Sequence, residues 1–201
     1  MTKTYLTLLA LLSTLTLYAQ KWPEYGLSQV RIIEADRTIV ARIEPSGKPD
    51  IYTGRQYYWY SSNTIQTTQG GFSGRLLHGI YQEFYISKNL KTQGYFKKGL
   101  KDGVWKSWNE NGTLIETETW QQGSKNGEFT TYDALGRQKQ QGNYKDGFRE
   151  GKVRSYQGPD SVTTVRYKAG QPVKAAPASP TVWQKLKEFR LWKKHSPKTT
   201  A

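Results

Sequence analysis

Along the middle of the chain, short runs that alternate apolar and polar side chains are separated by glycine-containing turns. The run VWKSWN (104–109) is followed by Glu110, Asn111 and Gly112, and then by TLIETETW (113–120). An Asn-Gly pair between two such runs is a strong signal of a β-hairpin, because both residue types tolerate positive φ. Loops such as GLKDG, GSKNG and GFREG separate one hairpin from the next, and their glycines allow the chain to reverse. The pattern predicts an all-β fold, an elongated antiparallel meander of hairpins.

The hairpin pattern recurs with a period of 24 residues. The matching positions form four rows: Gly79, Gly103, Gly127 and Gly151; Tyr81, Trp105, Phe129 and Val153; Phe84, Trp108, Tyr132 and Tyr156; Phe96, Trp120 and Tyr144. A weaker copy begins at Gly54 and a shortened one ends at Gly170, as expected where a stack of repeats terminates. We therefore predict a repeat domain over residues 54–170, in which each hairpin buries its rings against its neighbours.

The first two aromatic rows are separated by three residues, as in Trp105 and Trp108. In a regular strand an odd separation places two side chains on opposite faces. Either a bulge turns both rows inward, or one row lies at the surface. We interpret the rows as packing positions, because one hairpin alone cannot bury its rings. A surface row of Tyr81, Trp105 and Phe129 is the alternative, and it would suit a glycan-binding module.

These units resemble MORN repeats, in the shorter variant that runs G-x-aromatic-x-x-aromatic, then N-G, then G-x-aromatic-x-x-G. The matching segments are GIYQEF, GVWKSWNENG, GEFTTYDALG and the spacers GYFKKGLKDG and GNYKDGFREG. The last unit departs from the pattern, with Val153 and GPD in place of an aromatic residue and N-G. The resemblance implies a scaffold or a protein-interaction role. Proteins of this build also resemble the antitoxin components of toxin–antitoxin systems. This likeness would imply neutralisation of a partner toxin, although export fits a cytoplasmic antitoxin poorly.

The N-terminal flank predicts export. Lys3 precedes an apolar stretch from Tyr5 to Ala19, and a polar sequence begins at Gln20. A charged start, an apolar middle and a small residue at the end are the order of a secretory signal peptide, assigned here to residues 1–19. The destination would be the periplasm, the cell envelope or the medium. Residues 20–53 hold two β-branched runs, which predict a hairpin that pairs with the first repeat and caps it.

The C-terminal flank changes composition after Gly170. Residues 171–180 form a Pro/Ala linker, 181–195 an amphipathic helix that Ser179 and Pro180 can start, and 196–201 a tail. Residues 171–201 contain seven Lys or Arg residues against Glu188, a net charge of +6. The predicted contacts with an anionic membrane surface or a partner are Trp183, Lys185, Lys187, Arg190, Trp192, Lys193 and Lys194. A solvated tail, or a helix that covers the last sheet edge, is the alternative.

Composition narrows the chemistry further. The 201 residues carry a net charge of +14 and no cysteine, which excludes disulfides, thiolate metal sites and a cysteine nucleophile. The whole chain has two histidines, His78 and His195, so a His/Cys metal site has no ligand set. Nucleic acid would suit the charge, but export disfavours it.

Candidates for catalysis are few. Glu116 and Glu118 lie on one face of the same predicted strand, where a pairing with lysines is a better explanation than glycoside hydrolysis. No G-x-S-x-G elbow and no G-K-[ST] phosphate loop occurs in the sequence. We therefore expect a protein that is not an enzyme, with no cofactor, no metal and no small-molecule substrate, which binds a protein partner.

Overall fold

A computed structural model describes residues 28–44, 51–158 and 161–173. In these residues the chain folds entirely as antiparallel β-structure, without a helix. The thirteen strands are β1 (Ser28–Ile33), β2 (Arg37–Ile43), β3 (Gln56–Ser61), β4 (Thr64–Gln69), β5 (Arg75–Tyr85), β6 (Leu90–Lys97), β7 (Leu100–Trp108), β8 (Leu114–Gln121), β9 (Ser124–Tyr132), β10 (Gln138–Lys145), β11 (Phe148–Gly158), β12 (Ser161–Lys168) and β13 (Gln171–Pro172). The prediction of an all-β antiparallel meander is confirmed.

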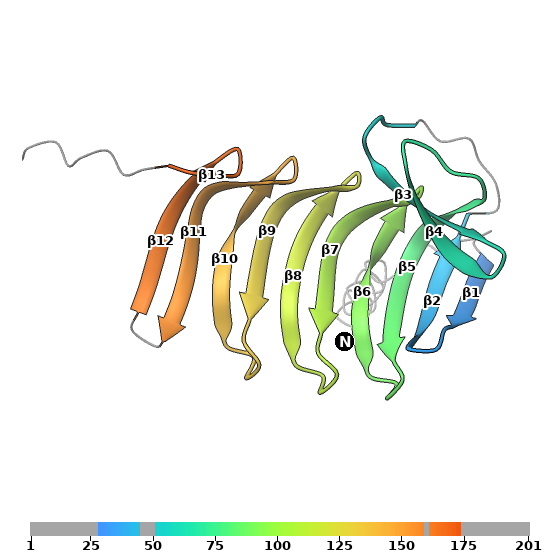
Figure 1. Ribbon diagram of the computed structural model, residues 1–201, viewed down its shortest axis with the longest axis horizontal. Helices are drawn as coiled ribbons and strands as arrows, with labels where there is room; N and C mark the ends of the chain where they lie inside the picture. The colour runs from blue at the N-terminus through green and yellow to red at the C-terminus, as the bar shows by residue number, and fades with distance from the viewer. Residues whose placement is uncertain (1–27, 45–50, 159–160, 174–201) are drawn as a thin grey trace, which may run out of the picture.

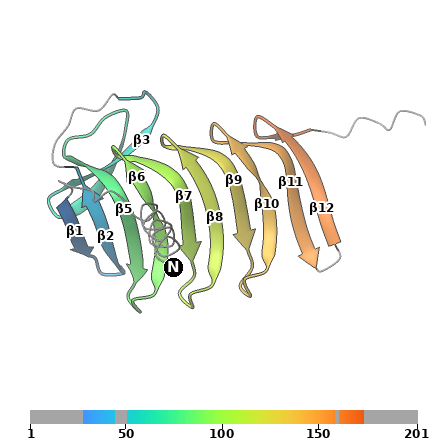
Figure 2. The same cartoon turned by 180° about the vertical axis from the view of Figure 1, so that it is seen from behind.

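From β5 to β13 every strand pairs with the next one along the chain, which gives an elongated, twisted sheet (Figures 1 and 2). The β1–β2 hairpin joins the other end of this path, because β2 pairs with β5 from Arg37↔Tyr85 to Ile43↔Leu77. The hairpin predicted within residues 20–53 therefore extends the sheet. The predicted signal peptide and C-terminal helix lie outside the described residues.

The tightest turns are not at the Asn-Gly pair. In the 109–113 turn only Gly112 has positive φ, and the side chain of Asn109 accepts a hydrogen bond from the Thr113 amide at 2.8 Å. Two-residue turns with positive φ at both central positions lie instead between these hairpins, at Lys98-Gly99, Gln122-Gly123 and Asp146-Gly147. Such turns match the right-handed twist of the flanking strands. The loops expected to be mere spacers are thus themselves tight hairpin connections.

The β3–β4 hairpin, which the sequence predicts to be a weak copy of the repeat, lies off the path of the main sheet. β3 pairs with β5 only at Trp59↔Leu76 and Tyr60↔Arg75, and the amide of Tyr58 donates to the Gly99 carbonyl at 2.8 Å. Figure 1 shows the hairpin in front of the β5 end of the sheet. The N-terminal hairpin thus pairs with the β5–β6 hairpin, while the β3–β4 hairpin forms a second layer.

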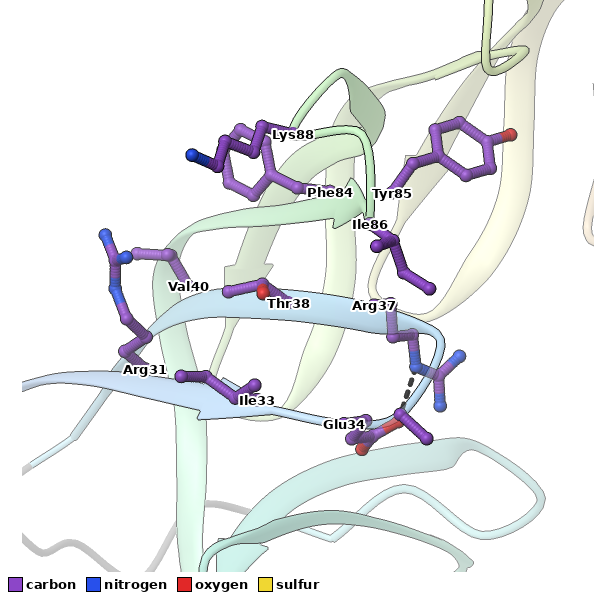
Figure 3. A pocket seen from close by; sticks show the side chains of 11 residues that line it. Arg31, Ile33, Glu34, Arg37, Thr38, Val40, Phe84, Tyr85, Ile86 and Lys88 are labelled. Atoms are coloured by element: carbon purple, nitrogen blue, oxygen red, sulfur yellow. Dashed lines mark hydrogen bonds and ion pairs between the residues drawn. The ribbon is translucent and has the colours of Figure 1, made fainter.

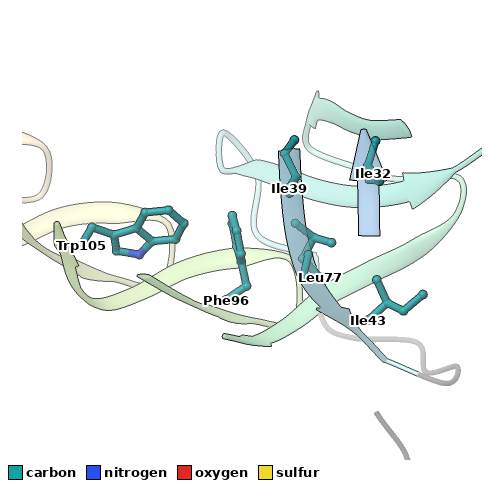
Figure 4. Close-up of a cluster of buried hydrophobic side chains, with 7 residues drawn as sticks. Ile32, Ile39, Ile43, Leu77, Phe96 and Trp105 are labelled. Atoms are coloured by element: carbon teal, nitrogen blue, oxygen red, sulfur yellow. The ribbon is translucent and has the colours of Figure 1, made fainter. Parts of the chain in front are cut away.

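The core lies under this second layer. Its buried side chains are Ile32, Ile39, Ala41, Ile43, Leu77, Phe96 and Trp105 (Figure 4). Tyr58 of β3 packs on Phe96 with ring centroids 4.9 Å apart. Beside this core, Tyr57, Leu76 and Leu100 form a smaller buried cluster. The aliphatic side chains thus gather at the β1–β7 end, where two layers meet. Toward β12 the fold depends on rings spread along one sheet.

Candidate functional site

Alternation along the strands divides the aromatic rows between two faces of the sheet. In β7, Trp105 is 5 % exposed while Val104 on the other face is 54 % exposed. We call the face that carries Tyr81, Trp105 and Phe129 the inner face, and the opposite one, which carries Trp108, the outer face. Phe129 and Val153 on the inner face are 2 % exposed, so this row is core. The buried Trp105 and Phe129 rings are not offered to a glycan.

The Phe84, Trp108, Tyr132 and Tyr156 row lies at the hairpin tips, where its side chains are half-buried. Trp108 pairs with Leu114 after Ser107 pairs with Glu116, so the bulge at this point is in β8 and leaves the alternation of β7 intact. Of the two explanations for the three-residue spacing, the structure therefore supports one row inward and one outward. The β10–β11 ladder ends at Gln140↔Ser155, before it reaches Tyr156.

On the inner face a row of cations alternates with the remaining rings. Lys101 Nζ lies 4.2 Å from the ring centroid of Trp105 and 4.8 Å from that of Trp120. Lys125 Nζ lies 5.2 Å from the Tyr144 centroid, and Arg149 5.6 Å from that of Tyr167. Such contacts are favourable when partly desolvated. Sequence reasoning missed this row, although Lys101, Lys125 and Arg149 share the 24-residue spacing of the rings.

One of the two carboxylates of β8 forms an ion pair with a lysine. Glu118 is buried, forms an ion pair with Lys125, and accepts a hydrogen bond from Trp120 Nε1 at 3.2 Å. Burial, followed by repulsion from Glu118, raises the pKa of Glu116 above its ordinary value. Burial also lowers the pKa of Lys101. The Glu118–Lys125 pair supports the expectation of ion pairing for Glu118.

Elsewhere, the described residues offer little for catalysis. They contain no group of three or more His, Cys, Asp or Glu side chains able to hold a metal ion. His78 Nδ1 accepts a 3.4 Å hydrogen bond from the Lys98 amide and lies 3.9 Å from Glu44. Within the same ranges no helix is long and apolar enough to cross a membrane. Trp183, Lys185, Lys187, Arg190, Trp192, Lys193, Lys194 and His195 lie outside the described residues.

The clearest candidate site is a cleft of about 410 Å³ on the outer face, at the β1–β2–β5 end of the sheet (Figure 3). Val40, Thr38 and Phe84 line it from neighbouring strands. Ile33, at the end of β1, is 76 % exposed, and Ile86, in the turn after β5, is 72 % exposed. Two large aliphatic side chains are thus exposed beside a concave wall. Exposed apolar groups that gather in one place mark binding surfaces.

Cations border this cleft. Arg37 donates to Glu34 at 2.6 Å and lies 3.4 Å from Glu83, so its charge is neutralised locally. Arg31 and Lys88 have no ion-pair partner among the described residues. The cleft therefore combines exposed aliphatic side chains with two unpaired positive charges, a composition that suits an apolar segment bearing an acidic group. Sequence reasoning placed Phe84 in a repeat row but gave no signal for the cleft, because its wall needs β2 beside β5.

Scans against protein-family models, curated proteins and solved structures each found no match. The function must therefore be argued from the residues of this chain.

Proposed function

We propose that this protein is an exported, non-enzymatic scaffold or protein-interaction module built from MORN-like repeats of 24 residues. The observation that carries the proposal is the cleft at β1, β2 and β5, where Ile33, at the end of the edge strand β1, and Ile86, in the turn after β5, are exposed beside the paired strands β2 and β5. The wall formed by Thr38, Val40 and Phe84 lies on strands, and a site built on strands is more precise than one built on loops. Export rests on the signal-peptide pattern of residues 1–19.

The repeat part of the proposal is supported by equivalent turn contacts. The amides of Gly99, Gly123 and Gly147 donate to the carbonyls of Leu77, Lys101 and Lys125, at 2.7, 2.9 and 2.8 Å. Each donor and each acceptor is 24 residues from the next. The buried positions Trp105, Phe129 and Val153 follow the same interval. A nearest-neighbour stack of this kind produces an extended surface, which is how repeat proteins bind their partners.

A non-enzymatic role is supported by the way the titratable groups are used. Glu83 binds Lys91 at 2.9 Å and accepts from Tyr81 at 3.1 Å, and Glu118 is occupied by Lys125 and Trp120. These carboxylates neutralise cations beside rings, and none of them borders the cleft of Figure 3. General acid–base chemistry requires a group within reach of a substrate.

The cleft is tested by changing its two exposed aliphatic residues together, Ile33→Asp and Ile86→Asp, in the full chain. A photo-crosslinking amino acid in place of Thr38, with partner identification by mass spectrometry, should capture a partner from the native envelope fraction. The aspartates should then weaken binding of that purified partner by about 10-fold or more, because binding would bury their negative charges in an apolar contact.

Val104→Asp is the matched control, because Val104 is also exposed on the outer face but lies on β7, away from the cleft. Binding should survive this change. Equal loss of binding in both variants, or unchanged binding in the cleft variant, would rule out the cleft as the interaction site.

The C-terminal segment gives the scaffold a means of association with the envelope. The basic stretch with Trp183 and Trp192 suits an anionic headgroup layer, at about 1 kcal/mol per cation near the surface. Flotation with vesicles that contain phosphatidylglycerol should carry the full chain upward and leave a 1–175 truncation at the bottom. Equal flotation of the two proteins would remove membrane association from the proposal.

A further inference from the structure

The outer face of β11 and β12 concentrates positive charge. Val153 is buried on the inner face, so its neighbours Lys152 and Arg154 point outward, where both are exposed. Lys152 pairs across the ladder with Arg166, which is exposed as well. Like charges directly opposite each other in a sheet destabilise it. This arrangement lowers stability, so a contribution to folding does not explain why these cations lie together.

These cations lack the neutralisation found on the inner face. There, Lys125 has Glu118 and Lys91 has Glu83. Lys152, Arg154 and Arg166 have no carboxylate within ion-pair distance in the parts of the chain that the structure describes. The nearest acid on the outer face of β11, Glu150, accepts a hydrogen bond from the Ala169 amide at 2.8 Å. The three charges are thus available to an external anion.

Groups that bind sugars surround the cations. Arg154 pairs with Gln141 on one side and with Thr164 on the other, which places an amide and a hydroxyl next to the guanidinium. Two residues further along β11, Tyr156 lines a cleft of about 480 Å³ together with Tyr132 and Lys139. The cleft lies at the tips, where the β9–β10 and β11–β12 hairpins separate beyond Gln140↔Ser155.

We propose that this face, formed by Lys152, Arg154 and Arg166 and continued by Tyr156, binds a linear acidic polysaccharide. Residues two apart on one face are about 7 Å from each other and cross-strand neighbours about 5 Å, so the cations form a short row that follows a charged polymer. Guanidinium and ammonium groups bind carboxylate or sulfate, while Tyr156 packs against a sugar ring. A bilayer surface fits less well, because the large apolar side chains exposed on this face of β11 and β12 among the described residues, Phe148 and Val162, lie at opposite ends of the two strands with the cations between them.

The test measures binding of the full chain to polygalacturonate at fixed ionic strength, with neutral dextran as the polymer control. The variant K152Q/R154Q/R166Q should weaken binding by about 10-fold or more and lower the salt dependence. Tyr156→Ala should weaken it by a smaller factor at unchanged salt dependence. Loss of fold is not a competing explanation, because removal of the like-charge pair should raise the melting temperature slightly.

The control variant K97Q/K98Q/K106Q removes three exposed lysines from β6, β7 and their turn, none of which forms an ion pair within the described residues. Gln is compatible with the positive φ of Lys98, since Gln122 occupies the corresponding position in the next turn. This variant should retain binding within about 2-fold, because its lysines lie on β6, β7 and their turn, away from the proposed face. The basic C-terminal segment is the same in both variants and contributes equally to each. Equal losses in the two triple variants would overturn the proposal. It would also be overturned if the β11–β12 variant affected only single-stranded DNA or phosphatidylglycerol vesicles.

Discussion

Individual glycines allow the rings of the inner face to pack closely against neighbouring strands. A Cβ built on Gly94 would overlap the indole of Trp105, and one on Gly142 would lie 2.9 Å from Phe129 and 2.8 Å from Val153. Neither glycine has positive φ, so the requirement at both positions is space and not backbone conformation. The absence of a side chain allows a large ring to lie against the neighbouring strand.

Gly94→Ala should therefore destabilise the protein by about 2–3 kcal/mol, since the Trp105 ring must move out of a packed core. Urea denaturation followed by tryptophan fluorescence measures this change. Gly71→Ala is the control, because a Cβ there meets nothing within 4 Å, and its effect should stay within about 0.5 kcal/mol. If both substitutions cost the same, the contact between Gly94 and Trp105 does not limit packing.

Glu116 predicts a dependence of stability on pH. Burial and then repulsion from Glu118 raise its pKa, while Lys125 and Lys101 oppose the shift. A carboxyl that holds its proton more tightly in the folded state lowers stability when ionised, and this penalty disappears as the pH falls through the raised pKa. Glu116→Gln should therefore melt at a higher temperature than the parent protein at pH 7, and at the same temperature near pH 4. A difference that persists at pH 4 would assign the effect to packing.

At the scale of elements, Tyr57 is the most deeply buried ring that holds the β3–β4 hairpin on the sheet. Tyr57 is fully buried with Leu76 and Leu100, and its hydroxyl accepts a hydrogen bond from the Tyr52 amide at 2.8 Å. Tyr57→Ala should cost about 3–5 kcal/mol and release the hairpin before the sheet unfolds. Hydrogen exchange of β3 and β4, compared with that of β9 and β10, measures the release. Tyr52→Ala is the control, because that side chain is 45 % exposed. Uniform loss of protection would show that the hairpin does not open separately.

The elements also show how far the sequence alone could lead. The period-2 alternation and the glycine-containing turns predicted the antiparallel meander, because each strand pairs with its sequence neighbour. The hairpin within residues 20–53 was expected to pair with the first repeat, but nothing local in Arg37–Ile43 indicates that its partner is β5 and not the strand that begins at Gln56, and the cleft depends on that pairing. The inner-face cations were readable from their spacing, whereas their burial requires knowledge of which face Trp105 occupies. The predicted contacts of residues 183–194 remain predictions.

At the scale of the whole molecule, the two ends of the sheet are built differently. The β1–β7 end has two layers, with Ile32, Leu77 and Phe96 each 1 % exposed or less between them. At the other end β12 pairs with β11 along its length, but with the two-residue strand β13 only at Tyr167 and Lys168. Its side chains are mostly exposed. A stack in which each strand contacts only its neighbours has a stability set locally by those contacts.

Hydrogen exchange followed by mass spectrometry should therefore give a gradient along the chain. Protection should be greatest in β5, β6 and β7, intermediate in β9 and β10, and least in β12, because opening from the β12 end breaks one interface at a time. A chain that ends after Asp146 should keep the exchange pattern of β5–β7, since no residue of β11–β13 belongs to the buried core of Figure 4. It should lose protection in β10, which then has no partner strand on one side and where Tyr144 loses its ladder partner Arg149. Equal protection from β5 to β12, or collapse of β5–β7 in the shortened chain, would mean that the sheet unfolds as one cooperative unit and that stability does not propagate from the two-layered end.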